Sequence, residues 1–179
     1  RDVPQEFVGD EAHRGDMVWS AAVPEELRSR ATAVIGNFPV SQASQYTRLE
    51  WLQTFSAGVD AYICPGVLPR GTMVTNASGA YGQSVSEHMF ATMWALMKNL
   101  NRYASNQRDH QWQDEGPVLS PEGGIALIIG VGDIGSHFAQ LAQSVGMRTF
   151  GVRRHADVPA KGIEKMYGFE RLETLLPLA

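Results

Sequence analysis

Short apolar runs recur along the first half of the chain, at residues 33–35, 52–55 and 72–75, and each one stops in small or polar residues. Helix-compatible stretches lie before and between these runs. In the stretch at 24–30 a proline stands in the first turn and acidic residues precede basic ones, as the helix dipole favours. Strands that alternate with helices in this way are typical of a parallel α/β layer.

From Ser84 onward the apolar positions change to three- and four-residue spacing, which is the period of an amphipathic helix. Ser84 and Glu87 match an S-x-x-E capping box, so the pattern predicts that the helix begins at Ser84. We expect this helix to be the longest element and to bury its methionine stripe between two lobes or at a dimer interface. Its apolar face comprises Val85, Met89, Met93, Leu96, Met97, Leu100 and Tyr103.

Residues 125–154 contain all the parts of a strand–helix–strand unit. The continuous apolar run at 125–129 suits a strand buried on both faces, and 147–152 forms a second strand. Between them, Gly146 is well placed as the left-handed cap of the helix C-terminus. The predicted apolar face of this helix comprises Ile134, Phe138, Leu141, Ala142 and Val145.

A G-x-G-x-x-G motif, formed by Gly130, Gly132 and Gly135, joins the first of these strands to the helix. The first glycine allows a tight turn, the second lets a pyrophosphate approach the backbone, and the third lets the helix pack close to the strand. A turn of this kind can serve structure alone. The strand before it and the strand after the helix favour dinucleotide binding instead, with Asp133 and Ile134 at the helix start where unpaired amides attract a diphosphate.

The end of the second strand bears on which cofactor is bound. An NAD site has an acidic residue about 20 residues beyond the motif, whereas this chain has Arg153, Arg154 and His155. Two guanidinium groups can bind a 2′-phosphate bidentately, so we expect NADP, with NAD still possible. The alternative is a solvated basic pair at a strand end.

Composition excludes several other classes of function. The 19 acidic and 15 basic side chains give a net charge of -4, and the bases are scattered, which argues against a nucleic-acid partner. The single cysteine, Cys64, favours a reducing, cytoplasmic compartment, and no apolar run is long enough to span a membrane. The five histidines show no metal-ligand spacing, and neither a G-x-S-x-G elbow nor a phosphate-binding G-x-x-x-x-G-K motif is present.

Three motifs in order, LEWLQTFSAGVD, MVTNASGAYGQSVSEH and the glycine turn, carry a resemblance to the D-isomer-specific 2-hydroxyacid dehydrogenases. The likeness is greatest to the glyoxylate and hydroxypyruvate reductase branch. It implies an α/β fold with two incomplete domains, a flavodoxin-like substrate domain at 1–80 and a Rossmann-type NAD(P)-binding domain at 81–179. The resemblance places the active site in the cleft between them.

The resemblance also assigns roles to individual residues. The backbone of Ala57 and Gly58 would hold the substrate carboxylate, and Tyr81 would face the cleft, while Asp60 has a structural place near a helix start. The neighbours Glu87 and His88 look like an acid/base pair. They are more simply a capping residue and a helix histidine.

The resemblance implies that the Arg, Glu and His that perform the family's chemistry lie beyond Ala179. It also implies that the next buried strand begins at 175–179. On this basis we expect the chain to be a fragment without its catalytic triad. A strand and helix of the substrate domain are likewise expected ahead of Arg1. The implied function is NADP-linked reduction of a small 2-keto acid to the D-2-hydroxy acid by a homodimer. Alternatives are an NAD-linked phosphoglycerate dehydrogenase and a nucleotide-sensing binding module of the same fold without catalysis.

Overall fold

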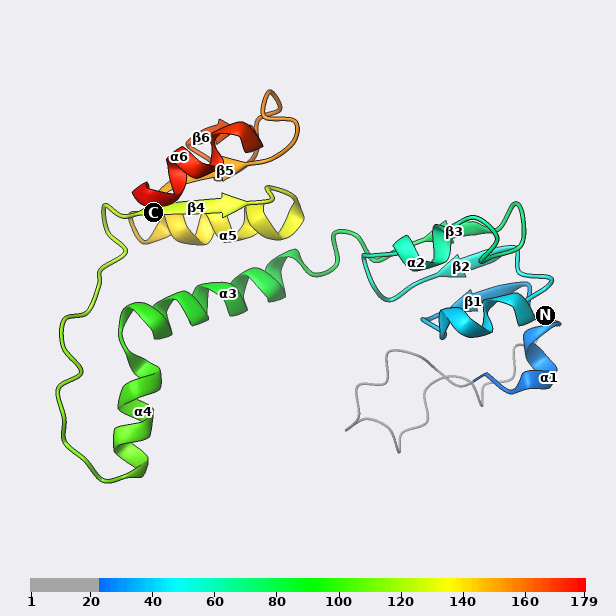
Figure 1. Cartoon of the computed structure of the whole chain (residues 1–179), viewed down its shortest axis with the longest axis horizontal. Helices are drawn as coiled ribbons and strands as arrows, with labels where there is room; N and C mark the ends of the chain where they lie inside the picture. Colours follow the sequence, from blue (N-terminus) through cyan, green and yellow to red (C-terminus); the bar gives the residue numbers. More distant parts are fainter. Residues whose placement is uncertain (1–22) are drawn as a thin grey trace. The chain divides into compact units, whose positions relative to one another are not determined.

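The computed structural model of the chain describes residues 23–179 and divides into two compact units, the first ending at Ala80 and the second beginning at Tyr81 (Figure 1). Each unit contains its own parallel sheet with its own buried core. Both are α/β, as the alternation of strands and helices predicts.

The first unit is a three-stranded parallel sheet in the order β1-β2-β3. Its strands are β1 (Ala33–Ile35), β2 (Trp51–Gln53) and β3 (Met73–Thr75), accompanied by α1 (Glu25–Arg28), the 3₁₀ helix η3 (Val40–Gln45) and α2 (Asp60–Ile63). The predicted strand at 52–55 is displaced: the observed strand ends two residues earlier. The reason is that the Phe55 amide donates to the Asn37 side chain at 3.0 Å rather than continuing the strand pairing.

The core of the first unit gathers around the loop that follows β1. Its buried residues are Phe38, Ala43, Tyr46, Leu49, Leu52 and Tyr62. The Tyr62 hydroxyl donates to the Phe38 carbonyl at 2.6 Å and lies 3.1 Å from the Phe38 amide, which donates to it. These bonds attach α2 to the loop after β1, and so hold the carboxyl ends of the strands in place.

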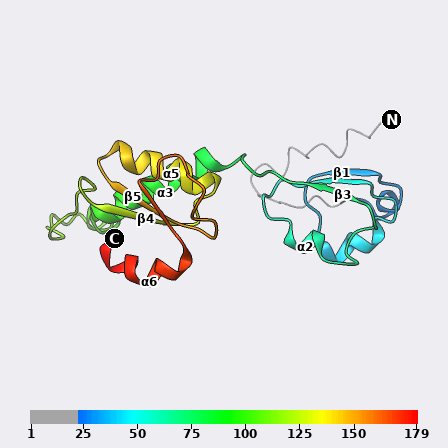
Figure 2. The same cartoon turned by 90° about the horizontal axis from the view of Figure 1, so that it is seen from above.

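The second unit contains the strands β4 (Ile125–Ile129), β5 (Arg148–Val152) and β6 (Lys165–Tyr167), all parallel, in the order β4-β5-β6. Helix α5 (Asp133–Ser144) packs on one face of this sheet and α6 (Leu172–Leu175) on the other (Figure 2). The strand at 125–129 is confirmed, and the next is confirmed with its start at Arg148 instead of 147. Gly146 has a φ of 82°, which confirms its left-handed cap.

Helix α3 (Gly82–Met97) is the longest helix in the described part of the chain, as expected, but the capping box predicted for its start is wrong. Tyr81 occupies the N-cap position without a side-chain cap, Ser84 lies inside the helix, and Glu87 accepts from the Gln83 side chain at 3.0 Å. Gly82, the first residue of the helix, lies close to α5. A Cβ there would come within 2.6 Å of the Asp133 carboxylate, so a larger residue would require that side chain to move.

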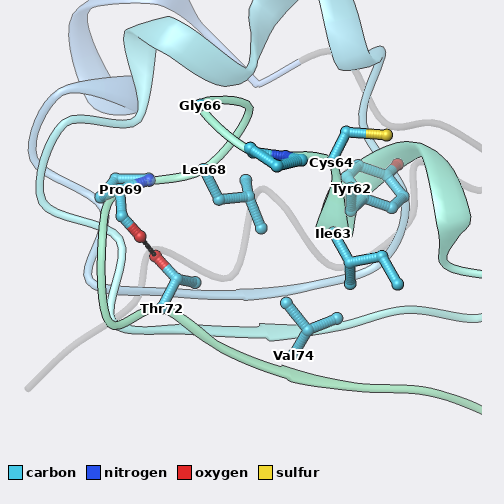
Figure 3. A pocket seen from close by; sticks show the side chains of 9 residues that line it. Tyr62, Ile63, Cys64, Gly66, Leu68, Pro69, Thr72 and Val74 are labelled. Atoms are coloured by element: carbon cyan, nitrogen blue, oxygen red, sulfur yellow. Dashed lines mark hydrogen bonds between the residues drawn. The ribbon is translucent and has the colours of Figure 1, made fainter.

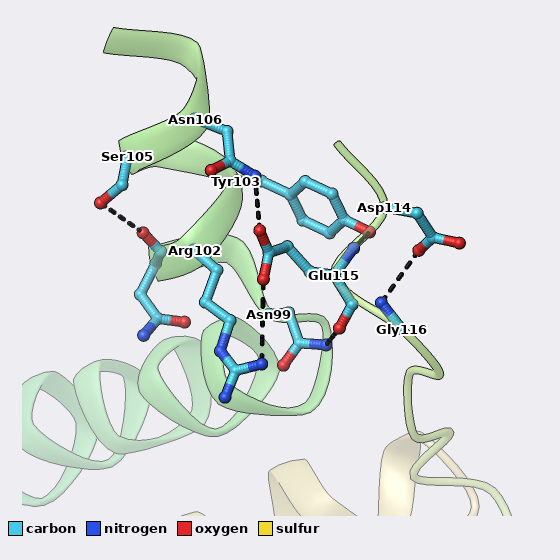
Figure 4. Close-up of polar contacts among 9 residues, drawn as sticks. Asn99, Arg102, Tyr103, Ser105, Asn106, Asp114, Glu115 and Gly116 are labelled. Carbon is cyan, nitrogen blue, oxygen red and sulfur yellow. Dashed lines mark hydrogen bonds and ion pairs between the residues drawn. The ribbon is translucent and has the colours of Figure 1, made fainter. Parts of the chain in front are cut away.

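The predicted apolar helix does not continue to Tyr103. It stops at Met97, and after Asn99, whose φ is 55°, a new helix α4 (Leu100–Arg108) begins. Glu115, in the extended segment that follows, is then held against α4: its carboxylate accepts from Asn106 at 2.6 Å, and its amide donates to the Tyr103 hydroxyl at 3.2 Å (Figure 4). The chain therefore turns at Asn99, and the segment that follows α4 packs back against it.

The expectation of a buried strand beginning at 175–179 is also wrong. These residues lie in α6 and the 3₁₀ helix η5 (Leu176–Leu178), after the short 3₁₀ helix η4 (Phe169–Arg171). Leu175 is buried against Phe150 and Val152 of β5, so the apolar run covers the sheet instead of joining it. The strand that does join the sheet, β6, is three residues long and too short to show a period in the sequence.

Candidate functional site

The glycine turn joins the carboxyl end of β4 to the start of α5. The Gly130 amide donates to the Val152 carbonyl at 2.9 Å, which holds the turn against β5. Gly130 has a φ of 94°, a conformation that side chains with a Cβ rarely adopt. The turn is thus fixed at the strand ends, where ligands bind in open parallel sheets.

The other two glycines of the motif meet different surroundings. A Cβ on Gly135 would collide with the Gly130 carbonyl oxygen and lie 3.2 Å from Ile128, so the helix packs closely only because no side chain is present. At Gly132, by contrast, a Cβ would meet nothing within 4 Å. The third glycine is required by the protein's own packing, whereas the space at the second is left open on the outer side of the turn.

The start of α5 offers unpaired donors beside this open space. Gly132 is the N-cap residue, no side chain caps the helix, and the amides of Asp133, Ile134 and Gly135 have no acceptor within residues 23–179. Such amides, with the positive end of the helix dipole, favour an anion. The Asp133 carboxylate lies 3.4 Å from Nδ1 of His137, one turn along the helix.

The face of α5 that is buried differs from the predicted one at its first position. The buried residues are Gly135, Ala139 and Ala142, and Ile134 is exposed. Close packing at Gly135 turns this narrow small-residue face toward the sheet and leaves Ile134 at its edge. Ile134 is therefore available at the mouth of the glycine turn.

The basic pair at the end of β5 is divided by the fold. Arg153 is half-buried and its guanidinium donates to backbone carbonyls, including that of Val131 within the glycine turn at 3.2 Å. Arg154 is exposed and makes no hydrogen bond or ion pair with the described residues. The two guanidinium groups predicted to act together therefore have separate surroundings.

In the first unit, the loop after β2 is held by its carbonyl groups. Asn76 donates from its side chain to the Ala57 carbonyl at 2.7 Å, and the Ser56 hydroxyl donates to the Gly58 carbonyl at 2.8 Å. The amides of Ala57 and Gly58 have no acceptor within residues 23–179, and both residues are exposed. Two amides with fixed neighbours make a small anion-binding arrangement.

Two asparagines that sequence reasoning did not select hold this loop. Besides Asn76, Asn37 donates to the Ser56 hydroxyl at 3.3 Å and accepts from the Phe55 amide. Each asparagine stands just beyond a strand, and that position was the available signal. Asp60 opens α2 as its first-turn acid, in line with the structural role expected for it.

Tyr81 is half-buried at the N-cap of α3, and its role toward a substrate stays a prediction. Glu87 and His88 both lie exposed on α3, and no hydrogen bond or ion pair joins their side chains.

A shallow hollow in the first unit is a feature that the sequence did not indicate. It has a volume of about 270 Å³ and opens beside α2 and the loop that follows it (Figure 3). Its lining exposes both polar and apolar atoms, and the Cys64 thiol donates to the Asp60 carbonyl at 3.2 Å. The lining residues are Tyr62, Ile63, Cys64, Pro65, Gly66, Leu68, Pro69, Thr72 and Val74.

Residues 23–179 lack the features of a metal site and of a membrane-spanning helix. No cluster of three or more His, Cys, Asp or Glu side chains suited to a metal occurs in that range. None of the helices there is long and apolar enough to cross a bilayer.

Comparison with known proteins gives a consistent result. The family model described as D-isomer specific 2-hydroxyacid dehydrogenase, NAD binding domain, matches residues 90–179. The D-3-phosphoglycerate dehydrogenase of Bacillus subtilis is 30% identical over 105 residues, which cover 58% of this chain and 20% of that protein. The glycerate dehydrogenase of Methylorubrum extorquens is 24% identical over 135 residues, covering 70% of this chain and 43% of that protein.

Among solved structures, a D-isomer specific 2-hydroxyacid dehydrogenase family protein from Aeromonas salmonicida superposes with a TM-score of 0.76 at 28% identity. The superposition covers 87% of this chain and 50% of that one. The chain therefore spans about half, or less, of the length of the proteins it matches.

Proposed function

Because the chain belongs to the D-isomer-specific 2-hydroxyacid dehydrogenase family, we propose that the whole protein is a nicotinamide-dependent oxidoreductase that interconverts a small 2-keto acid and its D-2-hydroxy acid. The single observation that supports this most strongly is the glycine turn. At Gly132 the space for a side chain is empty, and it adjoins the uncapped amides of α5. A pyrophosphate fits such a place by both shape and charge.

The loop after β2 supports a 2-keto acid as the substrate. The amides of Ala57 and Gly58 are exposed, while the carbonyl groups beside them are already bonded. An arrangement that offers N–H groups and no free carbonyl favours a carboxylate over a cation. We propose that these two amides bind the substrate carboxylate, with Tyr81 contributing from the start of α3.

NADP is the proposed cofactor, with NAD as the alternative. No acidic side chain stands at the end of β5, and Arg154 is exposed there. A carboxylate at that position would accept from the ribose hydroxyls of NAD, whereas a guanidinium attracts a 2′-phosphate. When bound, the reduced cofactor supplies the hydride, and a proton from an acidic group completes the hydroxyl group of the product.

We propose that the catalytic Arg, Glu and His lie outside residues 1–179, in a part of the protein that corresponds to the unmatched length of its relatives. In this proposal residues 1–80 belong to the substrate domain and residues 81–179 to the cofactor domain. The residues at hand then bind and orient the two reactants.

A steady-state assay of the full-length protein tests the proposal. We expect oxidation of NADPH in the presence of glyoxylate or hydroxypyruvate, faster than oxidation of NADH at equal concentrations. An Ala57→Pro variant removes one of the two amides and should raise KM for the keto acid. Saturable cofactor binding without turnover of any 2-keto acid would contradict the enzymatic proposal and favour a nucleotide-sensing module.

A second candidate is the phosphoglycerate dehydrogenase branch, favoured by the 30% identity to the Bacillus subtilis protein. The same assay, run with 3-phosphoglycerate and NAD, distinguishes it. Turnover of 3-phosphoglycerate with NAD, exceeding that of D-glycerate with NADP, would replace the first proposal by this one.

A further inference from the structure

The guanidinium of Arg153 contacts three backbone carbonyls at the carboxyl edge of the second sheet. Its Nε donates to the His155 carbonyl at 2.9 Å, and one terminal nitrogen donates to the Val131 carbonyl at 3.2 Å. The other terminal nitrogen donates to the Val158 carbonyl. All three nitrogens of the group are therefore engaged within the protein itself.

These carbonyls belong to two separate loops. Val131 lies inside the glycine turn, between Gly130 and Gly132, whereas His155 and Val158 lie in the loop that follows β5. One planar group with a rigid fork of donors thus connects the two loops. A single ammonium group is a compact point charge, and it cannot span the same set of acceptors.

The bond to Val131 has a consequence for the neighbouring amide. In a trans peptide the C=O and the N–H point in opposite directions, so holding the Val131 carbonyl toward Arg153 aims the Gly132 amide away from it. The Val131 side chain is buried, which leaves the peptide little freedom to rotate. The Gly132 amide is therefore held in one orientation, at a residue where the space for a side chain is open.

Arg154 has the opposite surroundings. It is exposed and has no hydrogen-bond or ion-pair partner among the described residues. Its donors remain available for a phosphate group, which a guanidinium binds bidentately.

We propose that the two neighbouring arginines have different tasks: Arg153 is a positioning residue that orders the glycine turn for the pyrophosphate of either cofactor, and Arg154 alone selects the 2′-phosphate of NADP. This inference rests on the proposed function only in that a nicotinamide dinucleotide occupies the turn.

Titration of the full-length protein with NAD and with NADP separates the two tasks. Arg153→Lys should raise the Kd of both cofactors by a similar factor, about tenfold for the loss of hydrogen bonds from one charged group. Arg154→Gln should raise the Kd of NADP about tenfold and leave that of NAD unchanged. Arg148→Gln is the matched control, because it removes a guanidinium from the opposite end of the same strand, and neither Kd should change.

Two results would overturn the inference. If Arg153→Lys weakened NADP alone, Arg153 would itself bind the phosphate. If Arg153→Lys lowered the melting temperature but left both Kd values unchanged at temperatures where the variant is folded, Arg153 would stabilise the fold without positioning the glycine turn.

A measurement on the unaltered protein covers the case in which an Arg153 variant does not fold. In a ¹H–¹⁵N spectrum, the Nε–H signal of Arg153 should exchange slowly and respond equally to 2′-AMP and 5′-AMP, whereas that of Arg154 should shift with 2′-AMP only. A 2′-AMP-specific shift of Arg153 would contradict the proposal. Cofactor binding without turnover of any 2-keto acid would refute the proposed function alone, and failure to bind either cofactor would refute both.

Discussion

The second and third glycines of the turn should respond differently to the same substitution, because Gly135 faces protein and Gly132 faces open space. In Gly135→Ala the new methyl group meets the Gly130 carbonyl, so we expect a loss of about 1–3 kcal/mol of folding free energy. In Gly132→Ala the methyl group meets nothing, so stability should change by less than about 1 kcal/mol while dinucleotide affinity falls. Urea unfolding and cofactor titration measure the two effects. Equal stability losses in both variants would contradict this assignment.

The ion pair between Arg148 and Glu164 predicts a pH dependence at the residue scale. Arg148 donates twice to the Glu164 carboxylate, at 2.6 and 3.0 Å, and this hydrogen bonding holds the pKa of Glu164 below its ordinary value. A carboxyl whose pKa is lower in the folded state contributes stability above its unfolded pKa of about 4.3, and that contribution is lost as the pH falls through the folded pKa.

We therefore expect the difference in melting temperature between the wild-type protein and Glu164→Gln to be present at neutral pH and to shrink in acid below about pH 4. The pair is exposed to solvent, so the effect is small and should weaken at high salt. Glu173→Gln, which removes an exposed acid from α6, is the control. A difference that stayed constant down to the acid limit would show that the hydrogen bonds from Arg148 do not stabilise the charged carboxylate.

At the scale of elements, the break between α3 and α4 depends on one left-handed residue. Asn99 has a φ of 55°, and its side chain donates to the Glu115 carbonyl at 3.3 Å. Asn99→Ala should destabilise the protein by about 1–2 kcal/mol, because alanine tolerates this conformation poorly and removes the hydrogen bond. Asn99→Gly is the matched variant and should cost less, since glycine accepts a positive φ. Urea unfolding measures both, and the reverse order would show that the break does not need a left-handed residue.

For the whole molecule, the prediction concerns what covers helix α3. Met89 and Leu96 are exposed on it in the single chain, with 41% and 64% of their surfaces accessible. We expect this apolar stripe to be buried in the assembled protein, between the two lobes or at a homodimer interface. If the stripe lies at a homodimer interface, Leu96→Glu should lower the mass measured by light scattering. If the stripe lies between the two lobes, the same substitution should lower the melting temperature. Gln107→Glu on α4 is the control and should change neither quantity. A protein unaffected by Leu96→Glu in both measurements would contradict the prediction.

Local chemistry in the sequence determined the strand–turn–helix–strand unit. Each of its features is recognised from a short stretch of sequence: the apolar run at 125–129, the three glycines and the cap at Gly146. All of them are found where they were predicted. A turn at Ala57 and Gly58 was likewise indicated by residue types, whereas its proposed substrate role came from the family resemblance. These features depend on backbone conformation and on the period of side chains, which neighbouring residues set.

Contacts between distant residues decided the rest. Helix α3 starts at Gly82, where the side chain of Asp133, about 50 positions later, lies against it. The last apolar run is helical because Leu175 packs on β5, and the basic pair is divided because carbonyls from two loops meet at Arg153. A sequence pattern records which side chains are apolar or charged, but the partner of each is chosen only when packing brings remote segments together.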